Sequence, residues 1–156
     1  IGVGTDRGYG VAPKRALAAL HQRLAAAGEV GAESLQRTGG AVPVAGMGAL
    51  YADSILFAGD AAGLTHPISG AGIAAAVASG AAAGEAVAAF VDGDAGAVPR
   101  YALEMEERFG PGQRRALARR GEMAPAWTGD GPAADAAARR GWIAFPEHYR
   151  EAAEAG

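Results

Sequence analysis

The chain has 156 residues, a net charge of −3 and no cysteine. This length suits about one ordinary domain. The acidic balance argues against the basic surface of a nucleic-acid-binding protein, and the lack of cysteine excludes disulfides and thiolate metal sites. Because the chain has three histidines and they are scattered, we expect no metal centre.

The first part of the chain predicts the end of a strand, a turn and one helix. Residues 1–4 are typical of a strand end and residues 6–10 of a turn. Pro13 suits the first turn of a helix, and Gly28 suits its end. Three leucines recur between them at helical spacing: Leu17, Leu20 and Leu24.

A glycine-bounded extended segment follows at residues 39–46. Its Pro43 favours the edge of a sheet over a central strand. A plain connecting loop is an equally good interpretation. Asp53 stands just before Ser54 and marks a turn, so we assign it no catalytic role.

The central stretch predicts a strand, an acidic residue, a loop and a long helix. Residues 55–58 are all apolar, which favours a strand covered on both faces. Gly59 allows a turn or a close approach to the backbone. Asp60 would then lie at the carboxyl end of the strand, where open α/β sheets bind ligands. Gly70 and Gly72 open the helix, whose free N–H groups favour an anionic group.

The helix expected over residues 70–91 carries one charged residue before Asp92, namely Glu85. A transmembrane helix is one interpretation, and Gly80 and Gly84 fit a close-packing motif of such helices. We prefer a helix buried against a sheet and a cofactor, because most of its apolar residues are alanine. His66, in the preceding loop, is expected to have a structural role in a tight turn; a hydrogen bond to a cofactor is the alternative.

The last part of the chain predicts further helices. Tyr101, Met105 and Phe109 form an apolar stripe within a helix over residues 98–109. Residues 129–132 mark a break, and the aromatic cluster at 141–146 is expected to dock the final helix, with a hydrophobic tunnel or a membrane-facing surface as the alternative. A basic helical patch is expected to be solvated, with contact to an acidic electron donor or lipid headgroups as the alternative; its members are Arg114, Arg115, Arg119 and Arg120.

The stretch from Gly59 to Ile73 resembles the second flavin-contacting motif of FAD-dependent oxidoreductases. It reads Gly59-Asp60-Ala61-Ala62-Gly63, then Pro67-x-x-Gly70-x-Gly72-Ile73. This pattern is similar to that of the geranylgeranyl reductase-like family. Related aromatic hydroxylases carry His at the position of Gly63 and Asn at that of Ile73, so both departures favour the reductase-like branch.

The resemblance implies FAD as the cofactor. In that family the aspartate matching Asp60 binds hydroxyls of the ribityl and ribose region, and the Pro-x-x-Gly-x-Gly turn lies along the isoalloxazine ring. The helix start faces the N1–C2=O edge of that ring. The residues implied to contact the cofactor are Gly59, Asp60, Ala61, Pro67, Gly70, Ala71, Gly72 and Ile73. No catalytic residue is implied, since a flavin itself carries the redox chemistry.

The resemblance also implies an α/β fold: the C-terminal part of an FAD-binding Rossmann-like fold with a helical C-terminal extension. Residues 1–50 would end a substrate domain and return the chain, 51–92 would close the FAD-binding domain, and 93–156 would be helical. Because the chain starts at Ile1 and shows no convincing Gly-x-Gly-x-x-Gly turn near its start, we expect it to be part of a longer enzyme and to hold FAD weakly alone.

The implied function is reduction of an isoprenoid or similar apolar double bond by hydride transfer from a flavin. NAD(P)H or a small redox protein would supply electrons, and a cytoplasmic location, with or without peripheral membrane contact, would follow. One alternative is a flavin-dependent monooxygenase or halogenase. Another, of a different class, is a small membrane-associated helical protein without a cofactor.

Overall fold

The computed structural model describes residues 1–5, 10, 12–124 and 132–150. They fall into two compact units, Ile1–Ala41 and Val42–Gly156. The turn expected at residues 6–10 and the break expected at 129–132 lie almost entirely outside the described residues.

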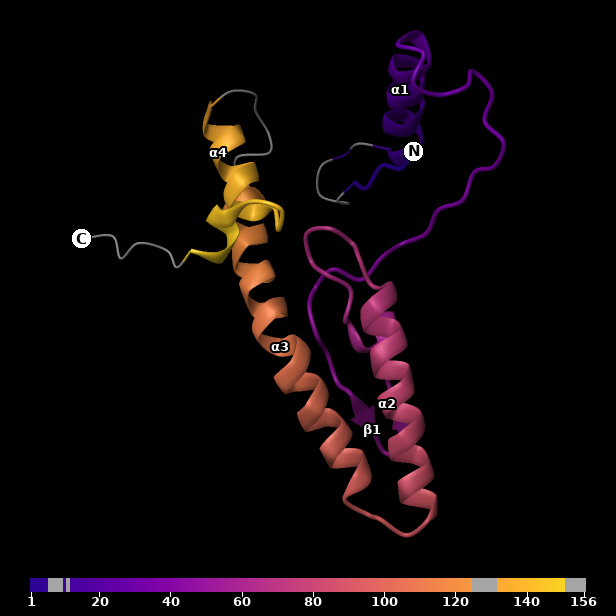
Figure 1. Cartoon of the computed structure of the whole chain (residues 1–156), viewed down its shortest axis with the longest axis vertical. Coiled ribbons are helices and arrows are strands. Elements are labelled where there is room, and N and C mark those ends of the chain that lie inside the picture. The colour runs from indigo at the N-terminus through magenta and orange to yellow at the C-terminus, as the bar shows by residue number, and fades with distance from the viewer. Residues whose placement is uncertain (6–9, 11, 125–131, 151–156) are drawn as a thin grey trace, which may run out of the picture. The chain divides into compact units, whose positions relative to one another are not determined.

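The first unit contains one helix, α1 (Pro13–Ala26), with proline in its first turn (Figure 1). Gly28 follows with a φ of 73°, and its N–H donates to the carbonyl of Ala25. This agrees with the predicted start and end, because glycine adopts the left-handed conformation that closes many helices. The strand end expected at residues 1–4 is wrong, since residues 1–5 form no regular structure.

The second unit begins with a two-stranded hairpin. Strand β1 (Tyr51–Ala52) pairs antiparallel with β2 (Ile55–Leu56). The turn between them places Asp53 at a φ of 50°, which aspartate tolerates better than most residues. A short 3-10 helix, η2 (Gly59–Ala62), comes next, so Asp60 lies within η2 and not at the end of a strand.

The expected α/β Rossmann-like fold is wrong: helices account for 57% of the described residues and strands for 3%. The apolar run at residues 55–58 is a strand only as far as Leu56, and its first residue, Ile55, is 58% exposed. A tight turn after β1 makes an antiparallel hairpin, whereas parallel strands need a long crossover. An apolar run also fits several environments, so it does not specify a parallel sheet.

Two long helices dominate the second unit, α2 (Ile73–Val91) and α3 (Ala97–Met123), and they pack side by side (Figure 1). The sequence predicted a helix over residues 98–109 and a helical patch at 114–120, and α3 joins the two through Pro111. A proline ring normally clashes with the side chain before it. Gly110 precedes Pro111 and has no Cβ, which reduces that clash.

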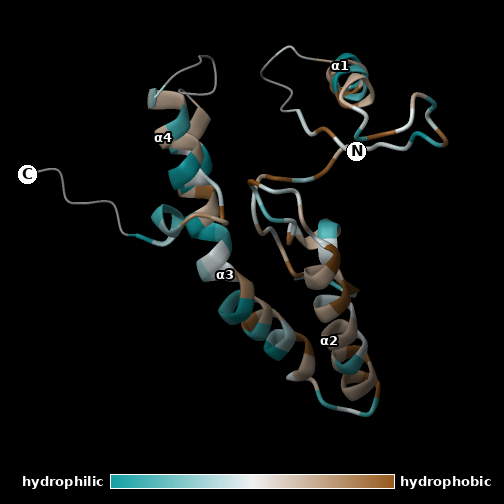
Figure 2. Ribbon diagram, turned by 45° about the horizontal axis from the view of Figure 1, so that its top comes forward, coloured by the Kyte–Doolittle hydropathy of each residue, from teal (hydrophilic) through white to brown (hydrophobic). Residues whose placement is uncertain are grey.

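Helix α2 is long and apolar enough to cross a membrane by length and composition, a test that core helices of soluble proteins also pass. Only 17% of its most apolar window is buried within the structure. The sequence predicted a buried helix, but the described residues leave most of α2 exposed. Figure 2 shows apolar colour along most of α2, in contrast to the polar bands on α3. Its large exposed side chains are Ile73, Val77, Val87, Phe90 and Val91.

The core of the second unit lies between η2, α2 and α3. Tyr101 and Met105 of α3 are 2% and 0% exposed, and they pack with Leu50, Leu64 and Ala86. The Tyr101 hydroxyl donates a 2.6 Å hydrogen bond to the carbonyl oxygen of Phe57. Two of the three residues of the predicted stripe are thus in the core, and Phe109 packs at its edge.

The last elements among the described residues are α4 (Pro132–Gly141) and a 3-10 helix, η4 (Pro146–Tyr149). Helix α4 packs on α3, where a Cβ on Gly141 would lie 1.4 Å from the sulfur of Met123. The buried Arg119 of α3 bonds the carbonyl of His148. Docking therefore relies on Gly141 and Arg119, whereas Trp142 of the aromatic cluster is 41% exposed.

Replacing Tyr101 by Phe should lower the free energy of unfolding by about 1–2 kcal/mol, because the carbonyl of Phe57 loses its bond within a buried site. Urea titration followed by circular dichroism measures this change. Tyr51, which is 42% exposed, is the control: Tyr51→Phe should change the value by less than about 0.5 kcal/mol. Equal effects of the two substitutions would contradict this account of the core.

Candidate functional site

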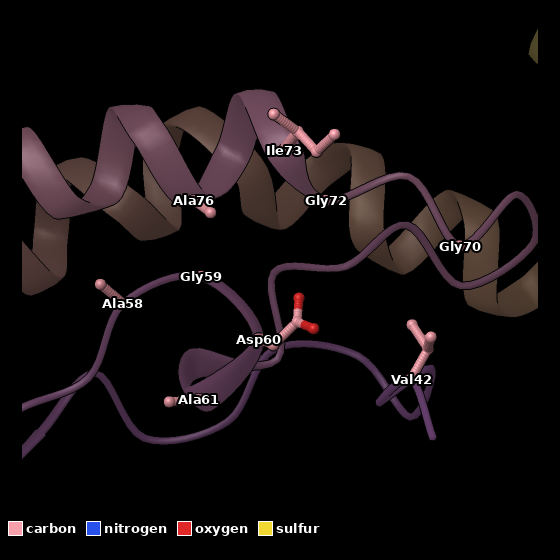
Figure 3. A pocket seen from close by; sticks show the side chains of 9 residues that line it. All are labelled: Val42, Ala58, Gly59, Asp60, Ala61, Gly70, Gly72, Ile73 and Ala76. Carbon is pink, nitrogen blue, oxygen red and sulfur yellow. The ribbon is translucent and has the colours of Figure 1, made fainter. Parts of the chain in front are cut away.

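A pocket of about 550 Å³ lies at the start of α2 (Figure 3). Six of the eight residues predicted to contact a cofactor line it: Gly59, Asp60, Ala61, Gly70, Gly72 and Ile73. The other two lie elsewhere, since Pro67 is buried and Ala71 lines a second pocket. The structure thus brings most of the predicted residues together although the predicted sheet is absent.

Glycine conformation shapes the floor of this pocket. Gly59 has a φ of 54°, and a Cβ there would lie 2.9 Å from the Cβ of Ala76 in α2. Gly63 has a φ of 68°, and a Cβ there would lie 2.2 Å from the carbonyl oxygen of Gly46. Both positions therefore require glycine for backbone conformation and for space, and they hold η2 close to its neighbours.

One buried side chain of α2 holds η2 in place by hydrogen bonds. Ser79, which is 0% exposed, accepts a 2.9 Å hydrogen bond from the N–H of Gly59 and donates a 2.7 Å bond to the carbonyl of Ala75. Both functions of the hydroxyl are used within the protein. Ser79 is therefore a structural residue that fixes η2 against the helix.

Asp60 is the charged group of the pocket. The hydroxyl of Thr65 donates a 2.5 Å hydrogen bond to its Oδ1. Among the described residues nothing donates to Oδ2, and the residue is exposed. In Figure 3 the carboxylate rises from η2 toward the segment that joins Gly70 and Gly72. One oxygen is thus positioned by the protein, while the other is free to accept a hydroxyl group.

The start of α2 forms the opposite wall. The first bond of this helix joins the N–H of Ala76 to the carbonyl of Gly72, and no side chain caps its N-terminus. The N–H groups of Ile73, Ala74 and Ala75 consequently have no partner within the helix. Together with the helix dipole they favour a negative or carbonyl oxygen at this position.

His66 organises the loop between η2 and α2. Its Nδ1 accepts hydrogen bonds from the N–H groups of Ile68 and Ser69, at 3.3 and 3.2 Å. Its backbone N–H donates to the carbonyl of Ala71 at 2.8 Å. Burial lowers the pKa of His66, and the charge of His148 lowers it further. These contacts agree with the structural role that the sequence favours and require an unprotonated Nδ1.

Four residues of the site were not predicted. Val42, Ala58 and Ala76 line the pocket, and Thr65 orients Asp60. Val42 belongs to the segment 39–46, which the sequence predicts to be extended. Nothing in the sequence marks Thr65 or Ala76 as part of a site, because small residues are frequent throughout this chain.

The predicted basic patch is largely engaged within the protein. Arg114 pairs with Glu106, and Arg119 is buried and pairs with Glu122. Arg120 donates to the carbonyl of Pro67. Arg115 lies 5.8 Å from the centre of the Tyr149 ring. Arg115, Arg119 and Arg120 therefore connect α3 to neighbouring segments, whereas the exposed Arg114 pairs within α3.

The stability of the second unit should fall as the pH falls through 6.5, the ordinary pKa of histidine. Because the folded state lowers the pKa of His66, the unfolded chain binds the proton more readily below this pH, and the folded state loses stability. His66→Asn should remove this contribution, since its amide oxygen can accept the same N–H groups without titrating. Urea titrations between pH 5 and 8 measure the effect.

His21→Asn in the first unit is the control and should leave the pH dependence of the second unit unchanged. An unchanged pH dependence in His66→Asn would show that His66 does not couple to folding.

No protein-family model matches the chain, and no curated protein or solved structure matches it. The geometry of the site and the Gly-Asp and Pro-x-x-Gly-x-Gly pattern are therefore the features that indicate its chemistry.

Proposed function

We propose that the chain supplies the flavin-contacting part of an FAD-dependent oxidoreductase. The observation that carries the proposal is the convergence of Asp60, Gly70 and Gly72 on one pocket at the bare start of α2. The motif named these residues from the sequence alone. A polyol needs an acceptor for its hydroxyl groups, and an anionic or carbonyl edge needs N–H donors. The pocket places both kinds of group side by side.

The residues present fit the hydroxyl-bearing part of FAD. Oδ2 of Asp60 has no donor among the described residues, and the residues lining the pocket include no lysine, arginine or histidine. A sugar or ribityl hydroxyl would donate to this carboxylate. A reduced flavin carries negative charge near N1, and the N–H groups at the start of α2 would stabilise it by up to about 2 kcal/mol if partly buried.

The reaction class follows from the resemblance to geranylgeranyl reductase-like enzymes. FAD, when bound, would supply the hydride for reduction of an isoprenoid or similar apolar double bond. This chain would orient the cofactor through Asp60 and the 67–72 turn. NAD(P)H or a small redox protein would be the electron donor. The location would be cytoplasmic or peripheral to a membrane. A flavin monooxygenase or halogenase is the alternative function with the same cofactor.

FAD should perturb the backbone amide resonances of Asp60, Gly72 and Ile73 in a nuclear magnetic resonance titration. Asp60→Ala should weaken the affinity at least about tenfold, because a buried sugar hydroxyl would lose its acceptor. Asp92, at the end of α2, supplies a control of equal charge: Asp92→Ala should leave the affinity unchanged. Perturbations that avoid the pocket, or equal affinities of the two variants, would exclude this flavin site.

Membrane association is a second candidate, favoured by the apolar and largely exposed α2. Flotation with phosphatidylcholine vesicles tests it. Val77→Asp on α2 should then reduce binding, whereas Leu103→Asp on α3, which is also an exposed apolar residue, should not. Absence of vesicle binding by the unmodified chain would exclude this candidate.

A further inference from the structure

Six residues form a continuous stripe, the α2 seam, on the exposed side of α2. They are Ile73, Val77, Gly80, Gly84, Val87 and Val91. Their spacing alternates between four and three residues, which places them on one side of the helix, as positions a and d of a coiled coil. All six are exposed. Apart from Ile73, none of them lines the flavin pocket, and in Figure 3 the side chain of Ile73 extends away from Asp60.

The order of large and small residues in the seam is the same in both directions from residue 82. Two antiparallel copies centred there pair large residues with large ones and glycine with glycine: Ile73 with Val91, Val77 with Val87 and Gly80 with Gly84. A two-fold dimer needs such a self-complementary surface, because every contact occurs twice. Contact with lipid requires only apolar character and no such order. Parallel copies would also match like with like, so charge has to decide the direction.

The charges of α2 favour the antiparallel direction. Its first turn has no acidic residue, its last turn has no basic residue, and Asp92 follows its end. Antiparallel copies place each negative end near the positive start of the other helix, whereas parallel copies bring the two negative ends together. Glu85 is the single charged residue within α2 and lies off the seam, so the contact buries no charge.

The two glycines of the seam have no function in the packing of the chain itself. A Cβ on Gly80 or Gly84 would meet no atom within 4 Å. Neither residue has the positive φ that would require glycine, and glycine inside a helix costs roughly 1 kcal/mol relative to alanine. Close approach of a second backbone is a reason for glycine at such positions. A facing helix would make that approach at the centre of the seam.

We propose that the α2 seam binds a second copy of the chain in an antiparallel, two-fold dimer. With 19 residues, α2 is about 28 Å long and about 10 Å wide. A facing copy therefore covers a strip on the order of 300 Å², which is below the roughly 800 Å² per partner of a standard complex. We expect a weak, reversible dimer. It does not depend on FAD, so it stands or falls separately from the proposed oxidoreductase.

Opposite charges at two facing positions test both the partner and the direction. Val77→Glu or Val87→Lys alone buries a charge against an apolar residue twice in the dimer, and each should weaken dimerisation at least about tenfold. The double variant sets the two charges against each other across the interface, and it should dimerise at least about tenfold more tightly than either single variant. The two positions are about 15 Å apart along one helix, so they cannot pair within one chain. Sedimentation velocity of the full chain without flavin, from micromolar to millimolar concentration, measures these constants.

A matched variant and a folding measurement accompany the test. Leu103→Glu changes an exposed apolar residue of α3 and should leave dimerisation unchanged. Glutamate and lysine form helices at least as well as valine, so circular dichroism of all variants should match that of the unmodified chain. The double variant carries both substitutions, so unfolding cannot explain its recovery.

Three outcomes would overturn the proposal. The first is an unmodified chain that stays monomeric at every concentration. The second is a double variant that dimerises no more tightly than the single variants, since antiparallel copies would bring its charges together. The third is a monomeric chain that floats with phosphatidylcholine vesicles, which would assign the seam to lipid.

Discussion

The second unit depends on hydrogen bonds that hold one loop, residues 59–72, against the two long helices. Polar side chains of α2 and α3 make these bonds. Ser79 of α2 holds the N–H of Gly59, while Gln113 and Arg120 of α3 hold the carbonyls of Thr65 and Pro67. Burial of Ala62 and Leu64 anchors this loop at two points, but burial is non-directional and does not by itself fix the backbone between them. Bonds from rigid helices give it one conformation, and both pockets are built on that conformation.

The same arrangement explains why α2 has two different faces. The face with Ser79 and Ala86 is buried against η2 and α3, where small side chains let the helices approach. The face with Ile73, Val77 and Val91 is exposed. Apolar surface of this extent on one helix usually marks an interaction site, so its exposure is consistent with either function considered for the chain.

Local signals predicted the helices and most of the first pocket from the sequence. Pro13 and Gly28 marked α1, and the glycines and aspartate of the motif named six residues that the pocket brings together. The architecture could not be predicted in this way. Four apolar residues in a row fit a central strand, an edge hairpin or a helix equally well, and only the pairing of Ile55 with Ala52 decided among them.

The contacts that complete the site could not be read from the sequence either. Gln113 is separated from Thr65 by 48 residues, and it lies just after Pro111, between the two stretches that were expected to be helical. Without a continuous α3, no pattern places Gln113 near the loop. This contact therefore became visible only with the fold.

Unpaired polar atoms distinguish the requirements of a ligand from those of the fold. A Cβ on Gly72 would lie 3.1 Å from Oδ1 of Asp60 and 3.2 Å from the hydroxyl oxygen of Thr65. Both contacts are tight inside the protein itself, so packing alone already explains glycine at this position. Oδ2 of Asp60 and Oε1 of Gln113 differ in this respect, because no described residue satisfies them. Oε1 is buried without a partner, which lowers the stability of the fold itself. Oδ2 belongs to an exposed side chain that water or a ligand hydroxyl can reach, so it is the oxygen that a bound molecule can use.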